Sequence, residues 1–308
     1  MSEPQRIAKY LSASMVASRR EAERMIAAGR VKVNGKVVDT PAVKVTDTDR
    51  VEVDGHLILG ASKRYVLLHK PPGVVCTRED PEGRNTVYSV LPSQLAGLAY
   101  VGRMDVNTTG VLLFTNDGDL AYRLLRPEYR VTRVYRVKVR GRVRSETAAR
   151  LVDQGVLDEG EVLKATGVEV VRYLSSTTVL RLALTEGKSH EVKRMFDALG
   201  HPVCALHRDE FGPIFLGRLP EGKWRELTAR EVEHLRQLVG LETAVGDSPR
   251  GRGSRGHGRP AGRGASDGLR GREPRTASRP SRPGGPGPRR DTPRSAGGRR
   301  PGGRQSAR

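Results

Sequence analysis

The chain has 308 residues and a formal net charge of +20 at pH 7, and 36% of its residues are hydrophobic. At ~100 to 200 residues per domain, this length allows two domains. No stretch approaches the ~20 consecutive apolar residues of a membrane span, and no apolar run follows the charged N-terminus, so we expect a cytoplasmic protein without a membrane anchor. The two cysteines, Cys76 and Cys204, lie far apart and in no metal spacing, which argues against a disulfide framework and a zinc site.

The C-terminal segment differs in composition from the rest of the chain. From residue 247 on there are 17 Arg, no Lys and 4 acidic residues, so this segment carries +13 of the net charge of +20. Its 15 Gly and 9 Pro, with no aromatic residue, predict a disordered tail, because such a segment cannot bury enough apolar surface to offset chain entropy. An Arg-rich tail attracts RNA through counterion release without choosing a site. A solubilising linker without a partner is the alternative, and acidic membrane lipid is a weaker one.

The first 36 residues read as two short helices and a hairpin, and they carry eight Lys or Arg against three Glu. We expect helices over 6–11 and 19–28, the second one started by a capping box of Ser18 and Glu21. Asn34-Gly35, between alternating apolar and basic positions, is the strongest short signal for a hairpin turn. The basic residues gather at helix starts and at the turn, which fits RNA backbone contacts as well as an ordinary solvated surface.

Residues 102–118, GRMDVNTTGVLLFTNDG, form the stretch around which the rest of the chain is organised. Gly102 and Gly110 permit backbone dihedrals or close approaches that are closed to other residues. The apolar run over 111–114 has the length and bulk of a core strand, and Asn-Asp-Gly after it is a turn signal. We therefore expect Asp105 in a sharp loop at the mouth of a buried strand, where it either does chemistry or merely accepts backbone hydrogen bonds.

A half-exposed strand is predicted over residues 133–140, because apolar and basic residues alternate there. Tyr135 should face one side of this strand and Arg136 the other. Lys70 ends an earlier strand at a Pro-Pro-Gly turn, and a strand exit explains it as well as a functional role does. The other predicted elements are strands over 65–69, 165–173 and 178–185 and helices over 120–125 and 145–154.

A helix is predicted within residues 186–200, EGKSHEVKRMFDALG. Ser189 is a good N-cap for it, and Gly200 is a good terminator. One face of this helix is apolar, and the opposite face carries His190, Lys193, Arg194 and Asp197. A helix start with cations beside free backbone amides favours a phosphate or a carboxylate as its partner.

These features resemble, in the same order, the RsuA/RluB family of ribosomal RNA pseudouridine synthases. The two helices and basic hairpin resemble the S4 RNA-binding fold, and the helix after residue 186 resembles the family's third motif. Residues 102–118 resemble the active-site signature, whose usual form has Leu where Met104 stands. The resemblance covers roughly residues 1–240. Its C-terminal part, similar to the RluB branch, suggests the large ribosomal subunit.

The fold class implied by the resemblance is α+β. It comprises a small S4-like α/β RNA-binding domain over residues 1–60 and a catalytic domain over residues 61–245, built on a mainly antiparallel mixed sheet. The Arg-, Gly- and Pro-rich basic tail over residues 246–308 would follow as a disordered segment.

The family's functional residues carry over to three positions. Asp105 would be the catalytic carboxylate, and Lys193 the basic residue that pairs with it. Tyr135 would stack on the target uracil, whereas a packed core tyrosine with a satisfied hydroxyl is the alternative. At Glu191 the chain departs from the Gln of many relatives, which weakens any inference about hydrogen bonds from this position.

Contacts to RNA are implied for two groups of cations. Arg103 is a hypothetical contact to the position vacated by the target base or to a neighbouring phosphate, and Arg194 is explained as well by a solvated helix surface as by RNA. In the S4-like domain, the cations expected to grip the backbone of an RNA helix are Arg19, Arg20, Arg30, Lys32 and Lys36.

Pseudouridine formation breaks the bond between C1′ of the ribose and N1 of uracil and rejoins the base through C5. It needs no redox change and no external energy, so we expect no cofactor and no metal. A carboxylate could attack C1′ or take a proton from the sugar, and both routes stay open. The expected partners of this monomer are ribosomal RNA and ribosome assembly intermediates. The competing hypotheses are a non-catalytic RNA-binding assembly factor and an RNA N-glycosidase that releases free uracil.

Overall fold

The computed structural model of the chain describes residues 3–241. The disordered tail predicted for residues 246–308 lies outside the described residues. Within the described part of the chain, no helix is long and apolar enough to cross a bilayer.

The N-terminal module packs two helices against a small antiparallel sheet in the order β3-β2-β5-β6. The Oγ of Ser18 accepts a hydrogen bond from the backbone N–H of Glu21 at 3.2 Å, so the second helix begins where the sequence predicts. Asn34 and Gly35 have φ of 51° and 81°, as a tight hairpin turn requires. The elements are β1 (Gln5–Arg6), α1 (Ile7–Ala13), α2 (Arg19–Ala27), β2 (Val31–Val33), β3 (Lys36–Val38), β4 (Lys44–Val45), β5 (Val51–Val53) and β6 (His56–Ile58).

A nine-stranded sheet follows, with seven strands in the order β13-β14-β10-β15-β9-β7-β17. The short strands β16 and β8 pair with the central strands β15 and β9. The β9–β15 pair is parallel and the other pairs are antiparallel, so the predicted mainly antiparallel mixed sheet is confirmed. The strands are β7 (Tyr65–Lys70), β8 (Ala99–Val101), β9 (Thr109–Thr115), β10 (Arg133–Arg140), β13 (Gly167–Tyr173), β14 (Thr177–Leu184), β15 (Val203–Phe211), β16 (Ile214–Phe215) and β17 (Trp224–Glu226).

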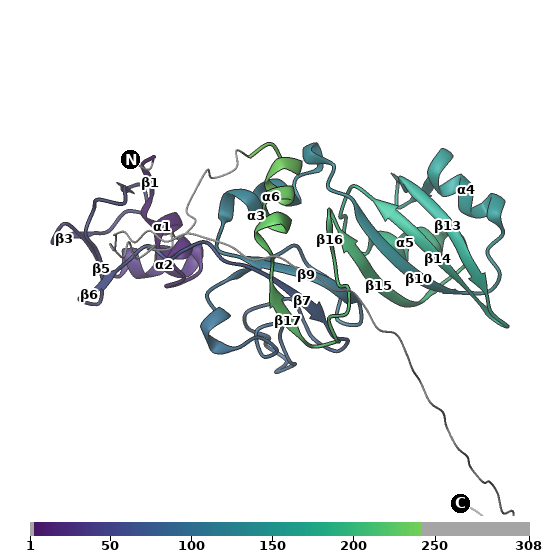
Figure 1. The fold of residues 1–308 in the computed structure, drawn as a ribbon, viewed down its shortest axis with the longest axis horizontal. Helices are drawn as coiled ribbons and strands as arrows, with labels where there is room; N and C mark the ends of the chain where they lie inside the picture. Colours follow the sequence, from purple (N-terminus) through teal and green to yellow (C-terminus); the bar gives the residue numbers. More distant parts are fainter. Residues whose placement is uncertain (1–2, 242–308) are drawn as a thin grey trace, which may run out of the picture. The chain divides into compact units, whose positions relative to one another are not determined.

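Helices cover both halves of this sheet. Figure 1 shows α3 and α6 beside each other at one half and α4 and α5 at the other. Thr228 and Glu231 form a capping box at the start of α6. Bounds of the helices and of a small hairpin are α3 (Gly118–Leu125), α4 (Ser145–Asp153), α5 (Glu191–Ala198), α6 (Ala229–Leu238), β11 (Val156–Asp158) and β12 (Glu161–Leu163), with short 3-10 turns η1 (Ser93–Leu95) and η2 (Pro127–Tyr129).

The parallel junction between β9 and β15 is unusually tight. Arg208 of β15 lies opposite Gly110 of β9, whose φ is 115°. A Cβ at Gly110 would come within 2.2 Å of the backbone carbonyl oxygen of Arg208, so only glycine allows the two strands to approach. This junction places the residues before β9 next to β15. Strand β10 is the neighbour of β15 on its other side.

The predicted start of the first helix needs correction. The first helix begins at Ile7, since Arg6 pairs with Lys44 between β1 and β4. The central strand β15 and the hairpin β11–β12 were not predicted, because neither segment shows a clear alternation of apolar and polar residues.

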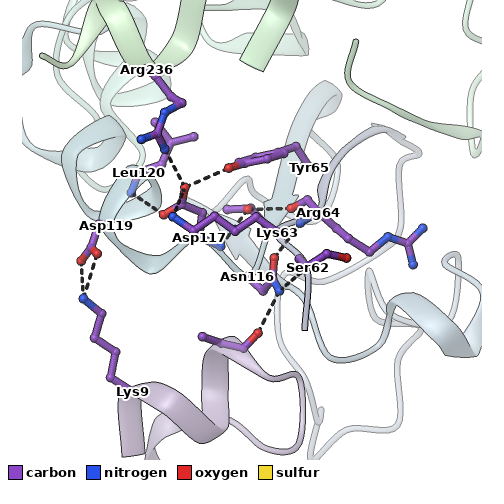
Figure 2. Close-up of polar contacts among 12 residues, drawn as sticks. Lys9, Ser62, Lys63, Arg64, Tyr65, Asn116, Asp117, Asp119, Leu120 and Arg236 are labelled. Atoms are coloured by element: carbon purple, nitrogen blue, oxygen red, sulfur yellow. Dashed lines mark hydrogen bonds and ion pairs between the residues drawn. The ribbon is translucent and has the colours of Figure 1, made fainter. Parts of the chain in front are cut away.

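Asp117, in the Asn-Asp-Gly turn after β9, ties three elements together (Figure 2). Its carboxylate is 2% exposed and accepts hydrogen bonds from the hydroxyl of Tyr65 at 2.9 Å and from the guanidinium of Arg236 at 3.1 Å. The ammonium of Lys63 lies 3.2 Å away, and the N–H of Leu120 donates to the same carboxylate at the start of α3. This turn therefore joins β7, α3 and α6.

Candidate active site

A pocket of about 430 Å³ opens between the loop before β9, the start of β10 and the start of α5. The three residues to which the sequence assigns catalysis, Asp105, Tyr135 and Lys193, all line it. Tertiary structure thus brings together side chains from three separate segments of the chain. Arg103 also lines this pocket, and its side chain is exposed.

The Asp105 loop is anchored from below. Met104 is 7% exposed within an apolar cluster, so it fills the hydrophobic role of the more usual leucine. Lys70 is fully buried, and its ammonium donates hydrogen bonds to the carbonyl oxygens of Val106 at 2.9 Å and Thr108 at 3.0 Å. Burial lowers the pKa of Lys70 to about 8. Because both carbonyls flank the signature loop, Lys70 holds the backbone beside Asp105.

Both oxygens of the Asp105 carboxylate have a basic partner. The Nζ of Lys193 lies 2.5 Å from Oδ2, so the predicted pairing is confirmed as a contact. The Nδ1 of His190 lies 3.2 Å from Oδ1. Since a carboxylate only accepts hydrogen bonds, both nitrogens donate to it. The Asp105 side chain is 25% exposed, which leaves one route open from the pocket.

The pKa of Asp105 lies below its ordinary value. Partial burial alone would raise this pKa, but the hydrogen bond and positive charge of Lys193 outweigh it, with His190 adding to the same effect. The site therefore holds a partly desolvated carboxylate in its ionised form at neutral pH.

The start of helix α5 differs from the sequence prediction. Ser189 is not its N-cap; His190 stands at that position, in the left-handed region with φ of 53°, and no side chain caps the helix. This backbone conformation turns the His190 side chain toward Asp105. Periodicity places His190 on the polar face of this helix, but no motif marks it as a partner of Asp105, so sequence reasoning missed this contact.

Tyr135 lies on β10, on the face of the sheet that carries the pocket. It packs partly against the core, while its neighbour Arg136 points to the opposite face and pairs with Asp209 at 2.5 Å. The predicted alternation of this strand is therefore confirmed. Leu206 and Phe211 also line the pocket, so the pocket has aromatic and aliphatic side chains in its wall as well as the carboxylate.

Glu191, the first residue of α5, is 5% exposed and also lines the pocket. Burial raises the pKa of its carboxyl group. One carboxylate oxygen accepts a hydrogen bond from the backbone N–H of Lys188 at 3.1 Å. Glu191 thus supports the turn that brings His190 to Asp105.

Arg194 points away from the pocket and is only 23% exposed. Its guanidinium donates to Asp158 at 2.6 Å and to Glu161 at 3.4 Å, and so it fastens the β11–β12 hairpin to α5. This environment favours the structural explanation of Arg194, while its contact with RNA stays a prediction.

The five cations of the N-terminal module that were predicted to bind RNA are exposed. Arg30 pairs with Asp54 through two hydrogen bonds, at 2.9 Å and 2.5 Å. The Nη2 of Arg19 lies 3.0 Å from where a Cβ at Gly118 would be, next to the start of α3. The exposed members of the predicted RNA-binding set are Arg19, Arg20, Arg30, Lys32 and Lys36.

Within residues 3–241, no group of three or more His, Cys, Asp or Glu side chains is placed to hold a metal ion. A carboxylate kept ionised by two basic neighbours, facing an aromatic ring across a pocket, is suited to nucleophilic or acid–base chemistry on a planar base and its sugar. Together with an exposed basic N-terminal module, this arrangement defines an enzyme that acts on RNA.

Comparison with known proteins specifies this class. Residues 64–198 match the family of RNA pseudouridylate synthases, and residues 5–51 match the S4 domain. An uncharacterized RNA pseudouridine synthase of Aquifex aeolicus is 44% identical, over 77% of this chain and 96% of its own length. The chain therefore belongs to the RNA pseudouridine synthases, and its N-terminal module is an S4 domain.

Other relatives agree with this assignment. The ribosomal large subunit pseudouridine synthase B of Bacillus subtilis is 38% identical, over 76% of this chain and 97% of its own length. The protein of the same name from Escherichia coli strain K12 is 41% identical, over 77% of this chain and 84% of its own length. The crystal structure of a pseudouridylate synthase, 32% identical, covers 75% of this chain and 99% of that chain with a TM-score of 0.53.

Proposed function

We propose that this enzyme isomerises one uridine of large-subunit ribosomal RNA to pseudouridine, with Asp105 as the catalytic carboxylate. The names of its relatives in Bacillus subtilis and Escherichia coli support the substrate. The observation that carries the role of Asp105 is its contact with Lys193 at 2.5 Å inside the pocket that Tyr135 lines.

The chemistry begins with an ionised Asp105. Its carboxylate either attacks C1′ as the bond to N1 breaks or removes a proton from the sugar, and the electron pair of the broken bond goes to the uracil ring. The detached uracil turns, and C5 bonds to C1′. In the first route the ester bond between Asp105 and C1′ breaks at this step, and in the second route Asp105 returns the proton to the sugar. The proton then leaves C5, and N1 gains one. No redox partner is needed at any step.

Lys193 and His190 make this carboxylate available. The two partners favour the charged form in a site where burial disfavours it. As Oδ2 is committed to the shorter contact with Lys193, Oδ1 is the oxygen that can exchange its contact with His190 for one with the ribose. Lys193 therefore acts on the reactivity of Asp105 more than on the binding of RNA.

Tyr135 receives the target base. A stacked uridine hides both C1′ and C5, so the nucleotide must leave its helix at a cost of a few kcal/mol. Stacking on an aromatic ring returns about 1 to 3 kcal/mol of that cost. Arg103, exposed at the same pocket, contacts the position vacated by the base or a neighbouring phosphate.

The RNA helix next to the target is held by the S4 domain, which we place within residues 1–60, while residues 61–245 form the catalytic domain. Phosphate contacts position the substrate but carry no sequence information. The protein acts as a monomer in the cytoplasm, on free ribosomal RNA or on ribosome assembly intermediates. The proposed contacts come from Arg19, Arg20, Arg30, Lys32, Lys36 and Arg194.

The test is the variant Asp105→Asn, assayed for tritium release from RNA labelled at C5 of uridine. We expect unchanged RNA binding and no tritium release. Asp197→Asn, an exposed carboxylate on α5, is the matched control and should retain activity. Tritium release by Asp105→Asn would remove Asp105 from the mechanism, and free uracil released by the wild-type enzyme would indicate an RNA N-glycosidase instead.

A further inference from the structure

Asn116 lies at a point where three segments of the chain meet. It directly follows β9 and is 8% exposed. Its Nδ2 donates hydrogen bonds to the carbonyl oxygens of Ala13 at 2.8 Å and Ser62 at 3.1 Å, and its Oδ1 accepts one from the backbone N–H of Arg64 at 2.8 Å (Figure 2). One amide group thus joins the end of helix α1 in the S4 domain, the connecting segment and the first catalytic strand.

A second contact joins the same two parts of the chain. The ammonium of Lys9, on α1, donates to both carboxylate oxygens of Asp119, on α3, at 2.7 Å and 2.8 Å (Figure 2). Both side chains are partly exposed, at 35% and 60%. The pair therefore restricts the orientation of α1 relative to α3 but contributes little to the free energy of the contact.

Close packing completes this interface. Met15 of the S4 domain packs against an apolar cluster of the catalytic domain. A Cβ at Gly97 would lie 2.5 Å from the Cβ of Met15, so the two backbones approach as closely as glycine permits. Such a fit tolerates few alternative placements of the S4 domain.

We propose that Asn116, with the Lys9–Asp119 pair, latches the S4 domain onto the catalytic domain at a fixed distance from the pocket of Asp105, and that this distance decides which uridine is modified. Asn116 is in this view a positioning residue that determines specificity. The proposal takes from the proposed function only that the reacting uridine enters this pocket.

A rigid element connects the latch to the pocket. Asn116 follows one end of β9, and the loop of Asp105 precedes the other end at Thr109. Strand β9 is buried along most of its length. It pairs with β7 on one side, and on the other side with β15 at its start and with β8 at its end. The distance between latch and pocket is therefore set by a strand that cannot bend or slide without breaking its ladder.

Site selection by distance suits the way the S4 domain binds. Contacts to the RNA backbone fix position and orientation but do not read bases. The identity of the modified uridine must then come from where the pocket lies relative to the gripped helix. A loosened S4 domain would sample many distances, so that the pocket would reach neighbouring uridines as well.

The experiment compares two substrates. The target uridine is first mapped on ribosomal RNA with the wild-type enzyme. One substrate is a long RNA fragment that contains this uridine and the helix held by the S4 domain, and the other is a short stem-loop that contains the uridine without that helix. With the long RNA, Asn116→Ala should lower the ratio of modification at the main uridine to that at its neighbours by about fivefold or more, as loss of a buried hydrogen-bonding group would allow. On the short stem-loop its rate should stay within twofold of the wild-type rate, as a rough bound for an unperturbed site.

Lys9→Ala, Asp119→Ala and the double variant form a cycle at exposed positions, where folding is not at risk. Each single change should lower the same ratio by about two- to fivefold. The double variant should be no worse than either single one, because the two side chains act as one pair. Glu210→Ala, which breaks the exposed Arg181–Glu210 pair within the catalytic domain, is the matched control and should leave the ratio unchanged.

Two outcomes would overturn the latch. Unchanged ratios in all of these variants would show that site selection does not depend on it. If Asn116→Ala instead lowered the rate on the short stem-loop by about fivefold or more, Asn116 would act on catalysis and not on site selection. Because the ratio compares sites rather than rates, it stays interpretable even if Asp105 proves not to be the catalytic group.

Discussion

Lys193 and Asp105 meet at 2.5 Å, from a helix and a loop that belong to distant parts of the chain. Burial and the lysine act on the same carboxylate in opposite directions, and the lysine prevails. This balance gives the site an acid that is shielded from water and still ionised. Its loss should be visible in how the rate depends on pH.

Lys193→Met should move the acid limb of the activity profile to higher pH. The pKa of Asp105 lies below its ordinary value in the wild type, so the reactive carboxylate is lost only as the pH falls below that value. Without the lysine, the effect of burial raises this pKa, and an opposite charge at such distances is worth ~1 to 3 pKa units. Single-turnover rates measured from about pH 3.5 to pH 7, a range that includes the ordinary pKa of an Asp side chain, would reveal the shift.

Lys138→Met, on the exposed face of β10, is the control for a lost lysine charge. Lys138→Met should change neither the acid limb of the pH–rate profile nor the rate on a short stem-loop. If Lys193→Met lowered RNA affinity with an unchanged acid limb, the lysine would be an RNA contact rather than the partner of Asp105.

Lys70→Met should slow catalysis, and it should abolish the fall in rate that we expect for the wild-type enzyme at alkaline pH. The Lys70 ammonium donates to three carbonyl oxygens, those of Pro71, Val106 and Thr108. Its pKa is lowered to about 8, so above that pH the neutral amine keeps only two N–H groups and must release one of these three carbonyl oxygens, two of which lie in the loop of Asp105. The wild-type rate should therefore fall as the pH rises from 7 to about 9, whereas the variant should be slow throughout.

Stability should respond in the opposite direction to the same titration. Between about pH 8 and the ordinary lysine value, the unfolded chain binds a proton that the folded chain has lost. The contribution of Lys70 to the free energy of unfolding therefore increases with pH in this window. Urea unfolding of wild type and Lys70→Met at several pH values measures it, and parallel curves would contradict the assignment.

Tyr135→Phe should keep turnover close to the wild-type rate, because the ring that stacks on uracil remains. Tyr135→Ala should reduce kcat/KM by about 5- to 150-fold, the equivalent of ~1 to 3 kcal/mol of stacking. Steady-state kinetics on one stem-loop RNA distinguishes the two variants. Complete loss of turnover in Tyr135→Phe would show instead that the hydroxyl moves a proton.

Gly110→Ala should destabilise the catalytic domain strongly. The added Cβ would collide with the backbone of Arg208 at 2.2 Å, in a conformation with φ of 115°. Overpacking of this kind costs about 1 to 3 kcal/mol or more, in addition to the strain of the positive φ. Thermal unfolding should show a much larger drop in Tm for Gly110→Ala than for Gly217→Ala, where φ is 60° and no atom lies within 4 Å. Equal drops would mean that the strands can separate.

Much of the local structure could be predicted from the sequence. The strand Arg133–Arg140 follows from strict alternation, and the hairpin at Asn34-Gly35 follows from turn residues that tolerate positive φ. The strand after Asp105 could be predicted from the length and bulk of the apolar run over residues 111–114. In each case the signal lies within a few neighbouring residues, and so does the physical cause.

Longer-range features could be reached only through the family resemblance or not at all. The pairing of Lys193 with Asp105 was expected from the resemblance, and the contact is present. Strand β15 shows no clear alternation, because one of its neighbours is parallel and its register is interrupted by bulges. The N-cap at Ser189 was wrong because the turn before α5 is set by the buried Glu191 and by Asp105, which lie outside any capping pattern.

By itself the sequence determined the helices, the turns, the alternating strands and the loop that carries Asp105, since backbone preference and hydrophobic periodicity act over a few residues. Only the tertiary structure decided that His190 reaches the second oxygen of Asp105, that Lys70 supports the loop from below, and that Asn116 joins the S4 domain to β9. These contacts form because the sheet, with its parallel β9–β15 pair, brings together backbone segments that are distant in the chain. The position of a side chain there is set by its neighbours in space and leaves no periodic trace along the chain.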